Sequence, residues 1–120
     1  MKPFDDFFLN ECKAITEQYD KLMGSWSQDS QLLHIITEVA EVKDVLRNKN
    51  HKYGYPESTE YKLKLLDEIA DVFLTSLALT NILEISNGDL NMAIVTKLAT
   101  VKNRVSKLTI EDSRKEEGEA

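Results

Sequence analysis

Apolar side chains recur along this chain every three or four residues, which is the spacing of one face of an α-helix. No stretch of useful length shows the strict alternation of a half-buried β-strand. Gly24, Gly54 and Gly88 divide the pattern into four segments. The sequence therefore predicts an all-α fold, an antiparallel four-helix bundle joined by short connections.

The first two segments have recognisable helix starts and stops. The first predicted helix begins near Pro3, because proline suits a first helical turn, and it ends at Gly24. The second follows Ser27, a good N-cap, with Asp29 in its first turn. Its apolar stripe consists of Leu32, Ile35, Ile36, Val39, Val42 and Leu46.

The third segment is predicted to be the longest helix. It follows Pro56 and Ser58 and continues to about Ser86. Asn87 and Gly88 come next, and they are expected to supply a left-handed stop.

The fourth predicted helix is capped by Asp89. Its apolar face consists of Leu90, Ile94, Leu98, Val101, Val105 and Leu108. Residues 109–120 carry seven charges in twelve positions and offer little to bury, so we expect a disordered tail. The predicted organisation is a single domain over residues 1–108 followed by this tail.

Composition and charge narrow the function classes. Hydrophobic residues make up 42% of the chain, enough to form a core. The formal net charge of -6 has the wrong sign for a protein that binds nucleic acid through its phosphates, so we expect no nucleic-acid partner. The single cysteine, Cys12, excludes an internal disulfide and, with only two histidines, a Cys/His zinc site. A reducing, cytoplasmic location fits best.

Neither a secretory signal nor a membrane span is expected. The first six residues include Asp5 and Asp6 where a signal peptide would continue into an apolar run. The longest uncharged apolar-rich stretch, residues 72–83, falls short of the roughly 20 residues that a bilayer requires. This stretch is expected in a core or a subunit interface.

Two pairs of acidic residues carry the candidate chemistry. Glu38 and Glu41 are three positions apart in the second helix, and Glu68 and Asp71 are three positions apart in the third. Residues at this spacing share one helix side, and two antiparallel neighbours can bring all four carboxylates together. Each pair also lies among apolar positions, although acidic pairs on solvated helix faces are common.

Four clustered carboxylates repel one another unless some are protonated or a cation lies among them. Oxygen ligands alone favour a hard ion, Mg²⁺ or Mn²⁺. A ferritin-like di-iron site would need Glu-x-x-His on two helices. Neither pair ends in histidine, and His34, four residues before Glu38, does not supply that pattern.

The segment from Trp26 to Val42, followed by the segment from Leu66 to Val72, resembles the MazG family of all-α nucleoside triphosphate pyrophosphohydrolases. The resemblance covers roughly residues 22–104. It implies hydrolysis of an NTP or dNTP to the monophosphate and pyrophosphate, including noncanonical or surplus nucleotides in pool cleansing. It also implies Mg²⁺, with Mn²⁺ as a substitute, held by the four motif carboxylates Glu38, Glu41, Glu68 and Asp71.

The attacking water needs a proton acceptor, and a motif glutamate can serve. We favour Glu41 over Glu38 for this role. Divalent ions that bridge carboxylates and phosphates would let an acidic protein accept a polyanionic substrate.

Candidate substrate contacts lie outside the motifs. Residues 47–55 carry three formal positive charges and no acid, so Lys49 and Lys52 are expected to contact phosphates, with a solvated loop as the alternative. Tyr53 and Trp26 are expected to stack on the base, or else to pin the loop and the helix entrance.

The fourth helix offers Lys97 and Arg104, seven positions apart on one flank of its apolar stripe. Relatives often place basic residues late in this region to hold phosphates, and packing of the long stems at a core edge is the alternative. Some larger family members carry asparagine about two turns after the last motif aspartate, whereas this chain has Ala78.

The third helix is apolar around too much of its circumference for a small monomer to cover, so we expect a homodimer or homotetramer. Two other functions stay open. One is a non-catalytic helical module that binds a metal or a partner. The other is a hydrolase of another nucleotide pyrophosphate, such as phosphoribosyl-ATP.

Overall fold

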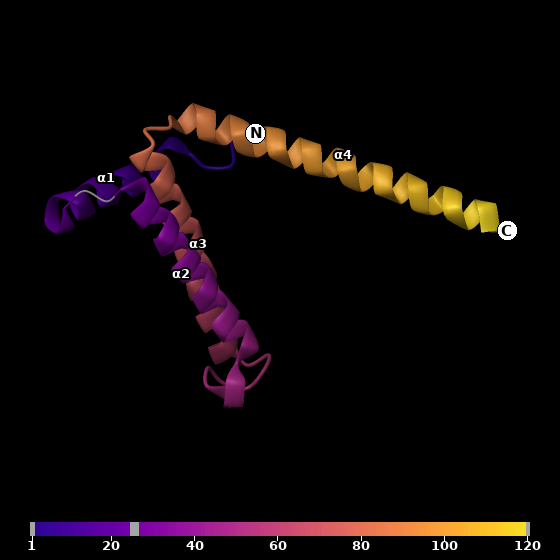
Figure 1. The fold of residues 1–120 in the computed structure, drawn as a ribbon, viewed down its shortest axis with the longest axis horizontal. Helices are drawn as coiled ribbons and strands as arrows, with labels where there is room; N and C mark the ends of the chain where they lie inside the picture. The colour runs from indigo at the N-terminus through magenta and orange to yellow at the C-terminus, as the bar shows by residue number, and fades with distance from the viewer. Residues whose placement is uncertain (1, 25–26, 120) are drawn as a thin grey trace. The chain divides into compact units, whose positions relative to one another are not determined.

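A computed structural model describes residues 2–24 and 27–119 of the chain, and over these residues it contains helices and no strands. The all-α prediction is confirmed for this part of the chain. The elements are shown in Figure 1 and are α1 (Asp6–Met23), α2 (Gln28–Arg47), the short 3-10 helix η1 (Lys49–His51), α3 (Thr59–Ile82) and α4 (Asn87–Glu119).

The chain divides into two units, which we describe separately. One unit consists of residues 7–85, and the other consists of residues 1–6 and 86–120. The first contains the α2–α3 hairpin with α1, and the second contains α4. The four-helix bundle and the single domain over residues 1–108 stay predictions.

Serine caps fix the starts of α2 and α3. The Ser27 side chain accepts a hydrogen bond from the Ser30 N–H at 3.1 Å, and the Ser58 side chain accepts one from the Tyr61 N–H at 3.2 Å. Each bond satisfies one of the N–H groups that a helix start leaves without a partner. Both predicted starts are confirmed.

The first helix is shorter than predicted. It begins at Asp6 instead of near Pro3, and it ends as expected at Gly24, whose N–H donates to the Asp20 carbonyl at 2.9 Å. Gly24 has a φ of +85°, a conformation that glycine adopts without a side-chain clash.

The end of α3 differs from the prediction. The N–H of Ile85 donates to Thr80 at 3.0 Å and that of Glu84 donates to Asn81 at 3.1 Å, the two bonds of a Schellman motif. Glu84 takes the left-handed position, with a φ of 57°. The expected stop at Asn87–Gly88 is therefore wrong, because the turn forms before those residues are reached.

Asn87 and Gly88 instead form the first turn of α4. The side chain of Ser86 accepts from the Asp89 N–H at 3.1 Å, so Ser86 caps this helix and the predicted cap at Asp89 is wrong. The helix then continues through the segment expected to be a disordered tail and ends at Glu119. That segment is rich in Glu, Lys and Arg, which favour helix even where nothing is buried.

The second unit ties the start of the chain to α4. The backbone N–H of Phe4 donates to Asn91 Oδ1 at 3.0 Å, and Asn91 Nδ2 donates to the Phe4 carbonyl at 2.9 Å. Asn91 is buried, and this paired contact satisfies its amide.

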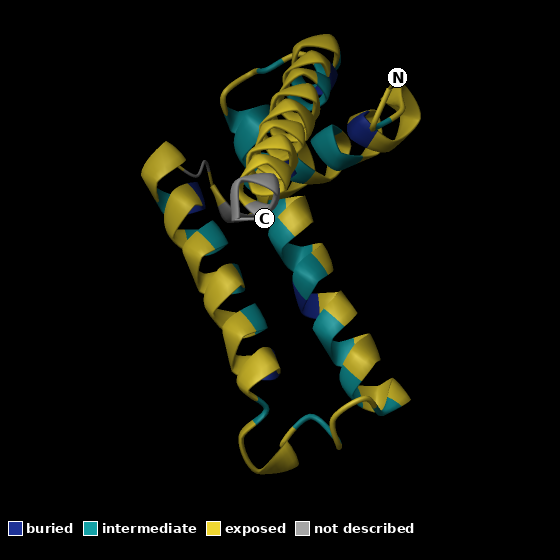
Figure 2. Cartoon of the chain, turned by 90° about the vertical axis from the view of Figure 1, so that its right-hand side faces the viewer, coloured by how far each residue is buried: buried dark blue, intermediate teal, exposed yellow. Residues whose placement is uncertain are grey.

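The first unit is built on an antiparallel pair. Helices α2 and α3 lie side by side and are joined by the η1 loop (Figure 1). Figure 2 shows their facing sides buried or half-buried and their outer sides exposed. Val45 and Leu77 are the buried apolar residues of the pair. Thr16 of α1 accepts a hydrogen bond from Asn81 Nδ2 of α3 at 3.3 Å, which ties α1 to the pair.

Large apolar side chains remain exposed on the outer sides of α2 and α3. They include Leu33, Ile36, Leu63, Leu66 and Phe73, each more than half exposed. Within the described ranges, no helix is both long enough and apolar enough to cross a membrane. The cytoplasmic location stays a prediction.

Replacing Ser58 by alanine removes the α3 cap and should lower the free energy of unfolding by about 1 kcal/mol. Ser76→Ala is the matched control, because the exposed Ser76 hydroxyl donates only to the Val72 carbonyl in the middle of the same helix. Urea unfolding followed by circular dichroism measures both. Equal effects of the two substitutions would contradict the capping role.

Candidate metal centre

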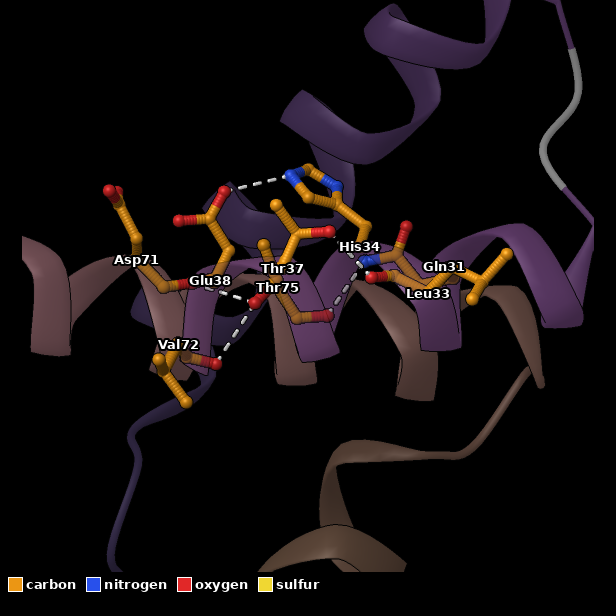
Figure 3. A network of polar contacts seen from close by, with 8 residues as sticks. All are labelled: Gln31, Leu33, His34, Thr37, Glu38, Asp71, Val72 and Thr75. Carbon is orange, nitrogen blue, oxygen red and sulfur yellow. Dashed lines mark hydrogen bonds and ion pairs between the residues drawn. The ribbon is translucent and has the colours of Figure 1, made fainter. Parts of the chain in front are cut away.

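The four motif carboxylates converge. Glu38 and Glu41 come from α2, and Glu68 and Asp71 come from α3. One oxygen from each lies within 4.8 Å of the others. Figure 3 shows the Glu38 and Asp71 side chains lying next to each other across the two helices. We call these four residues the carboxylate cluster.

The four residues of the carboxylate cluster differ in solvent exposure. Glu68 is buried, Glu38 and Asp71 are half-buried, and Glu41 is exposed. Glu38 Oε2 and Glu68 Oε2 are buried and have no hydrogen-bond partner among the described residues. A buried carboxylate oxygen without a partner is costly, so these two oxygens are suited to a cation.

Lys64 neutralises part of the charge. Its Nζ lies 2.8 Å from Glu68 Oε1, one helical turn away on α3. The hydrogen bond from Lys64 holds the pKa of Glu68 below its ordinary value, and the same contact raises the pKa of Lys64. Glu68 is therefore kept ionised and ready to bind a cation.

His34 contacts Glu38, a carboxylate that α2 contributes to the cluster. Its Nε2 lies 3.0 Å from Glu38 Oε1, and both residues are in α2 (Figure 3). This contact fixes one oxygen of Glu38 and leaves the buried Oε2 facing no protein donor among the described residues. His34 thus orients a carboxylate of the cluster.

The pKa values of the remaining two carboxylates are raised by their surroundings. The adjacent Glu68 carboxylate and the negative charge of Glu38 raise the pKa of Glu41 above its ordinary value. Burial and the negative charge of Glu38 raise the pKa of Asp71. Without a cation, both groups retain protons at a higher pH than isolated side chains do.

The cluster fits a hard divalent cation. All four donors are carboxylate oxygens, two buried oxygens have no protein partner in the described chain, and Glu41 leaves an accessible side. Mg²⁺ binds such oxygen ligands and commonly keeps several waters. Sulfur is absent from the donor set, which disfavours softer metals.

The η1 loop is folded by Asn48, which has a left-handed φ of 42° at the end of α2. Its Nδ2 donates to the Gly54 carbonyl at 2.8 Å, and its Oδ1 accepts from the Tyr53 N–H at 3.0 Å. The Tyr53 hydroxyl donates to Asp44. These bonds return the chain towards α3 in a defined path.

Tyr53 also links the loop to the cluster. The Lys64 ammonium, which pairs with Glu68, lies 5.9 Å from the centre of the Tyr53 ring, and the Lys52 ammonium lies 5.1 Å from it. Both distances suit a cation–π contact. The structure therefore brings Tyr53 and Lys52 to the Lys64 side of the cluster, and Lys49 is exposed in η1.

The roles of three other predicted substrate residues stay predictions. Trp26 lies outside the described residues. Lys97 and Arg104 are exposed on α4, which belongs to the other unit, so their contact with phosphates stays a prediction.

A cavity of about 290 Å³ lies beside the cluster, between α1, α2 and α3. Its walls are mostly apolar and include Ile15, Tyr19 and Leu74. His34 and Thr75 also line the cavity, and each contacts a residue of the cluster. His34 pairs with Glu38, and the Thr75 hydroxyl donates to the Asp71 carbonyl at 2.8 Å. The cavity and the cluster are therefore adjacent.

Sequence reasoning missed the residues of this cavity. The i, i+4 spacing of His34 and Glu38 was available as a signal, because such pairs meet on a helix face. Nothing in the sequence pattern indicated that Gln31 would contact Thr75 on another helix. Ala78 of α3 lines this cavity as well.

Comparisons of the chain with protein-family models, with curated proteins and with solved structures found no match. A proposal for the function of the chain therefore rests on its own residues and their geometry.

Replacing Asp71 by asparagine should stabilise the metal-free protein at neutral pH. The pKa of Asp71 is raised from its ordinary 3.8 in the folded state, so its contribution to stability is present at low pH and is lost as pH rises through the folded pKa. Asparagine carries no charge at any of these pH values. The gain over wild type in EDTA should therefore be large at pH 7 and shrink towards pH 4.

Thermal unfolding with and without Mg²⁺ completes this test. At a Mg²⁺ concentration 100 times its Kd, wild type should gain about 2.7 kcal/mol of stability, and Asp71→Asn should gain much less. Asp67→Asn is the control, since Asp67 is exposed on the same helix outside the cluster and its loss should leave the Mg²⁺ effect in place. If the stability gained by Asp71→Asn in EDTA does not vary with pH, the raised pKa of Asp71 is contradicted.

Proposed function

We propose that this protein is a Mg²⁺-dependent pyrophosphohydrolase that converts a nucleoside triphosphate to its monophosphate and pyrophosphate. The observation that carries the proposal is the convergence of four carboxylates from two helices beside an apolar cavity. The resemblance of the two motifs to the MazG family points to the same reaction.

Each side chain has a role in this proposal. Glu38, Glu68 and Asp71 are the more buried of the four and would hold the cation, with Lys64 keeping Glu68 ionised and His34 orienting Glu38. When bound, Mg²⁺ supplies the positive charge that offsets the phosphates and the leaving pyrophosphate.

Glu41 is proposed to accept the proton of the attacking water. It is the exposed member of the cluster, so solvent reaches it, and it borders the same cation position. A carboxylate at this place can accept a proton from a water molecule beside the cation. Glu38, whose Oε1 is occupied by His34, is less suited to this task.

The η1 loop is proposed to contact the phosphates. Lys49 and Lys52 bring positive charge to the connection between the two helices that carry the cluster, and Tyr53 holds Lys52 near Lys64. Lysine binds phosphate as a point charge. The loop can therefore complement the cation from the other side of a triphosphate.

The wild-type protein with Mg²⁺ should release pyrophosphate and a monophosphate from at least one member of an NTP and dNTP panel. Glu41→Gln should lower kcat by about 100-fold or more, because it removes the proton acceptor and keeps the shape. Asp67→Asn should retain activity. Chromatography of the products and a pyrophosphate assay measure the reaction.

Three outcomes would reject this proposal in part or in whole. Orthophosphate as the product would place the cleaved bond elsewhere in the triphosphate. Full activity of Glu41→Gln with Mg²⁺ still bound would remove Glu41 from the role of base. A wild type that binds Mg²⁺ and turns over no nucleotide would favour a non-catalytic binding module.

We also propose that a second copy covers the outer sides of α2 and α3. Five large apolar side chains that are more than half exposed there, Leu33, Ile36, Leu63, Leu66 and Phe73, exceed what scattered surface residues explain. Burying this surface in a symmetric contact would supply a core that the described residues of the pair lack.

Light scattering should therefore give a mass that is a multiple of the 13.7 kDa chain. Ile36→Asp should shift the protein towards monomer, because it places a charge in the contact. Lys21→Asp, at an exposed position of α1 away from the outer sides of α2 and α3, is the control and should keep the larger mass. A mass of one chain at every concentration would refute the oligomer.

A further inference from the structure

Gln31 is a buried polar residue in the wall of the cavity beside the cluster. It is 5% exposed, and it lines the cavity from α2. Its Nε2 donates to the backbone carbonyl of Thr75 on α3 at 2.8 Å. A buried amide that reaches across to a neighbouring helix is held in one orientation.

The contact with Thr75 decides which end of the amide faces the cavity. A backbone carbonyl only accepts hydrogen bonds, so the Gln31 end that touches it must be the NH₂ group. The oxygen then occupies the other position. Figure 3 shows the Gln31 oxygen turned away from the Thr75 carbonyl. No hydrogen bond to this oxygen is found among the described residues.

Among the described residues, none of the other polar groups of the cavity donates a hydrogen bond to this oxygen. The Thr16 hydroxyl donates to the Cys12 carbonyl at 2.9 Å. His34 Nε2 is engaged with Glu38. Asp20, a further polar residue of the lining, is a carboxylate and also accepts. The cavity therefore combines apolar walls with one acceptor, the Gln31 oxygen, whose orientation is fixed by the contact with α3.

A ligand that places a donor against the Gln31 oxygen gains a hydrogen bond there. A planar apolar body with an amino group fits, because the walls are aliphatic and aromatic and the oxygen is fixed in orientation. The nucleobase of the proposed substrate has this character. Its phosphates would lie at the cluster, and His34 and Thr75 join the cluster to the cavity.

We propose that Gln31 is a specificity-determining residue that selects the exocyclic amine of cytosine or adenine over the oxo group of their deaminated counterparts. This inference rests on the proposed function. An oxo group in place of the amine would set oxygen against the Gln31 oxygen, which cannot rotate without losing the Thr75 contact. A site built around one hydrogen bond rejects a ligand that lacks it more strongly than an apolar wall rejects a methyl group.

Two matched substrate pairs test this inference, dCTP against dUTP and dATP against dITP. Wild type should show a kcat/KM at least about tenfold higher for the amino member of each pair it hydrolyses. Gln31→Met keeps the size of the side chain and removes the oxygen, so this ratio should fall towards one. Leu74→Met, a size-conserving change in the cavity wall, should keep the ratio.

Binding supplies a readout without turnover. Isothermal titration calorimetry should show dCMP binding more tightly than dUMP to wild type and equally to Gln31→Met. If circular dichroism shows that Gln31→Met is unfolded, Gln31→Asn takes its place, because it withdraws the oxygen by one methylene and keeps the amide.

The outcomes separate the two proposals. Hydrolysis of both members of each pair with equal kcat/KM, or a preference that survives in the folded Gln31 variant, would refute the role of Gln31 and leave the pyrophosphohydrolase standing. Absence of pyrophosphate release from every nucleotide would refute the proposed function and the inference with it.

Discussion

The repulsion among four carboxylates within 4.8 Å of one another is the constraint on which the first unit depends. A group of like charges at this distance is unfavourable unless other groups offset it. Lys64 offsets part of it at Glu68, and His34 contacts Glu38. Two buried oxygens keep no partner in the described chain, so the arrangement is suited to binding a cation more than to stability by itself.

The same helix pair connects the cluster to a place for an organic group. Thr75 uses its hydroxyl on the Asp71 carbonyl and its own carbonyl on Gln31, so one residue of α3 contacts both the acidic turn and the cavity. Part of the negative charge of the chain is concentrated at this place. Four acids gather on the α2–α3 pair, basic side chains lie in the η1 loop, and an apolar cavity lies beside the acids.

Much of the helix layout was predictable from local patterns. Ser27 is an N-cap in both the sequence prediction and the structure, and the predicted helix start after Ser58 is confirmed, because helix starts depend on residues within one turn. The stop after α3 was misplaced because Glu84, instead of a glycine, takes the left-handed position. Ser86 then caps α4 from a position that the prediction assigned to α3.

The sequence by itself determined the helical class and the four carboxylates, because a period of three to four residues and a spacing of three positions are both local properties of a helix. Only the tertiary structure decided which carboxylate is exposed, that Lys64 pairs with Glu68, and that Gln31 reaches Thr75 forty-four positions away. Contacts between helices depend on how α2 and α3 are rotated and aligned. Periodicity does not specify that alignment, so the cavity and the orientation of its acceptor emerged only when the helices were packed.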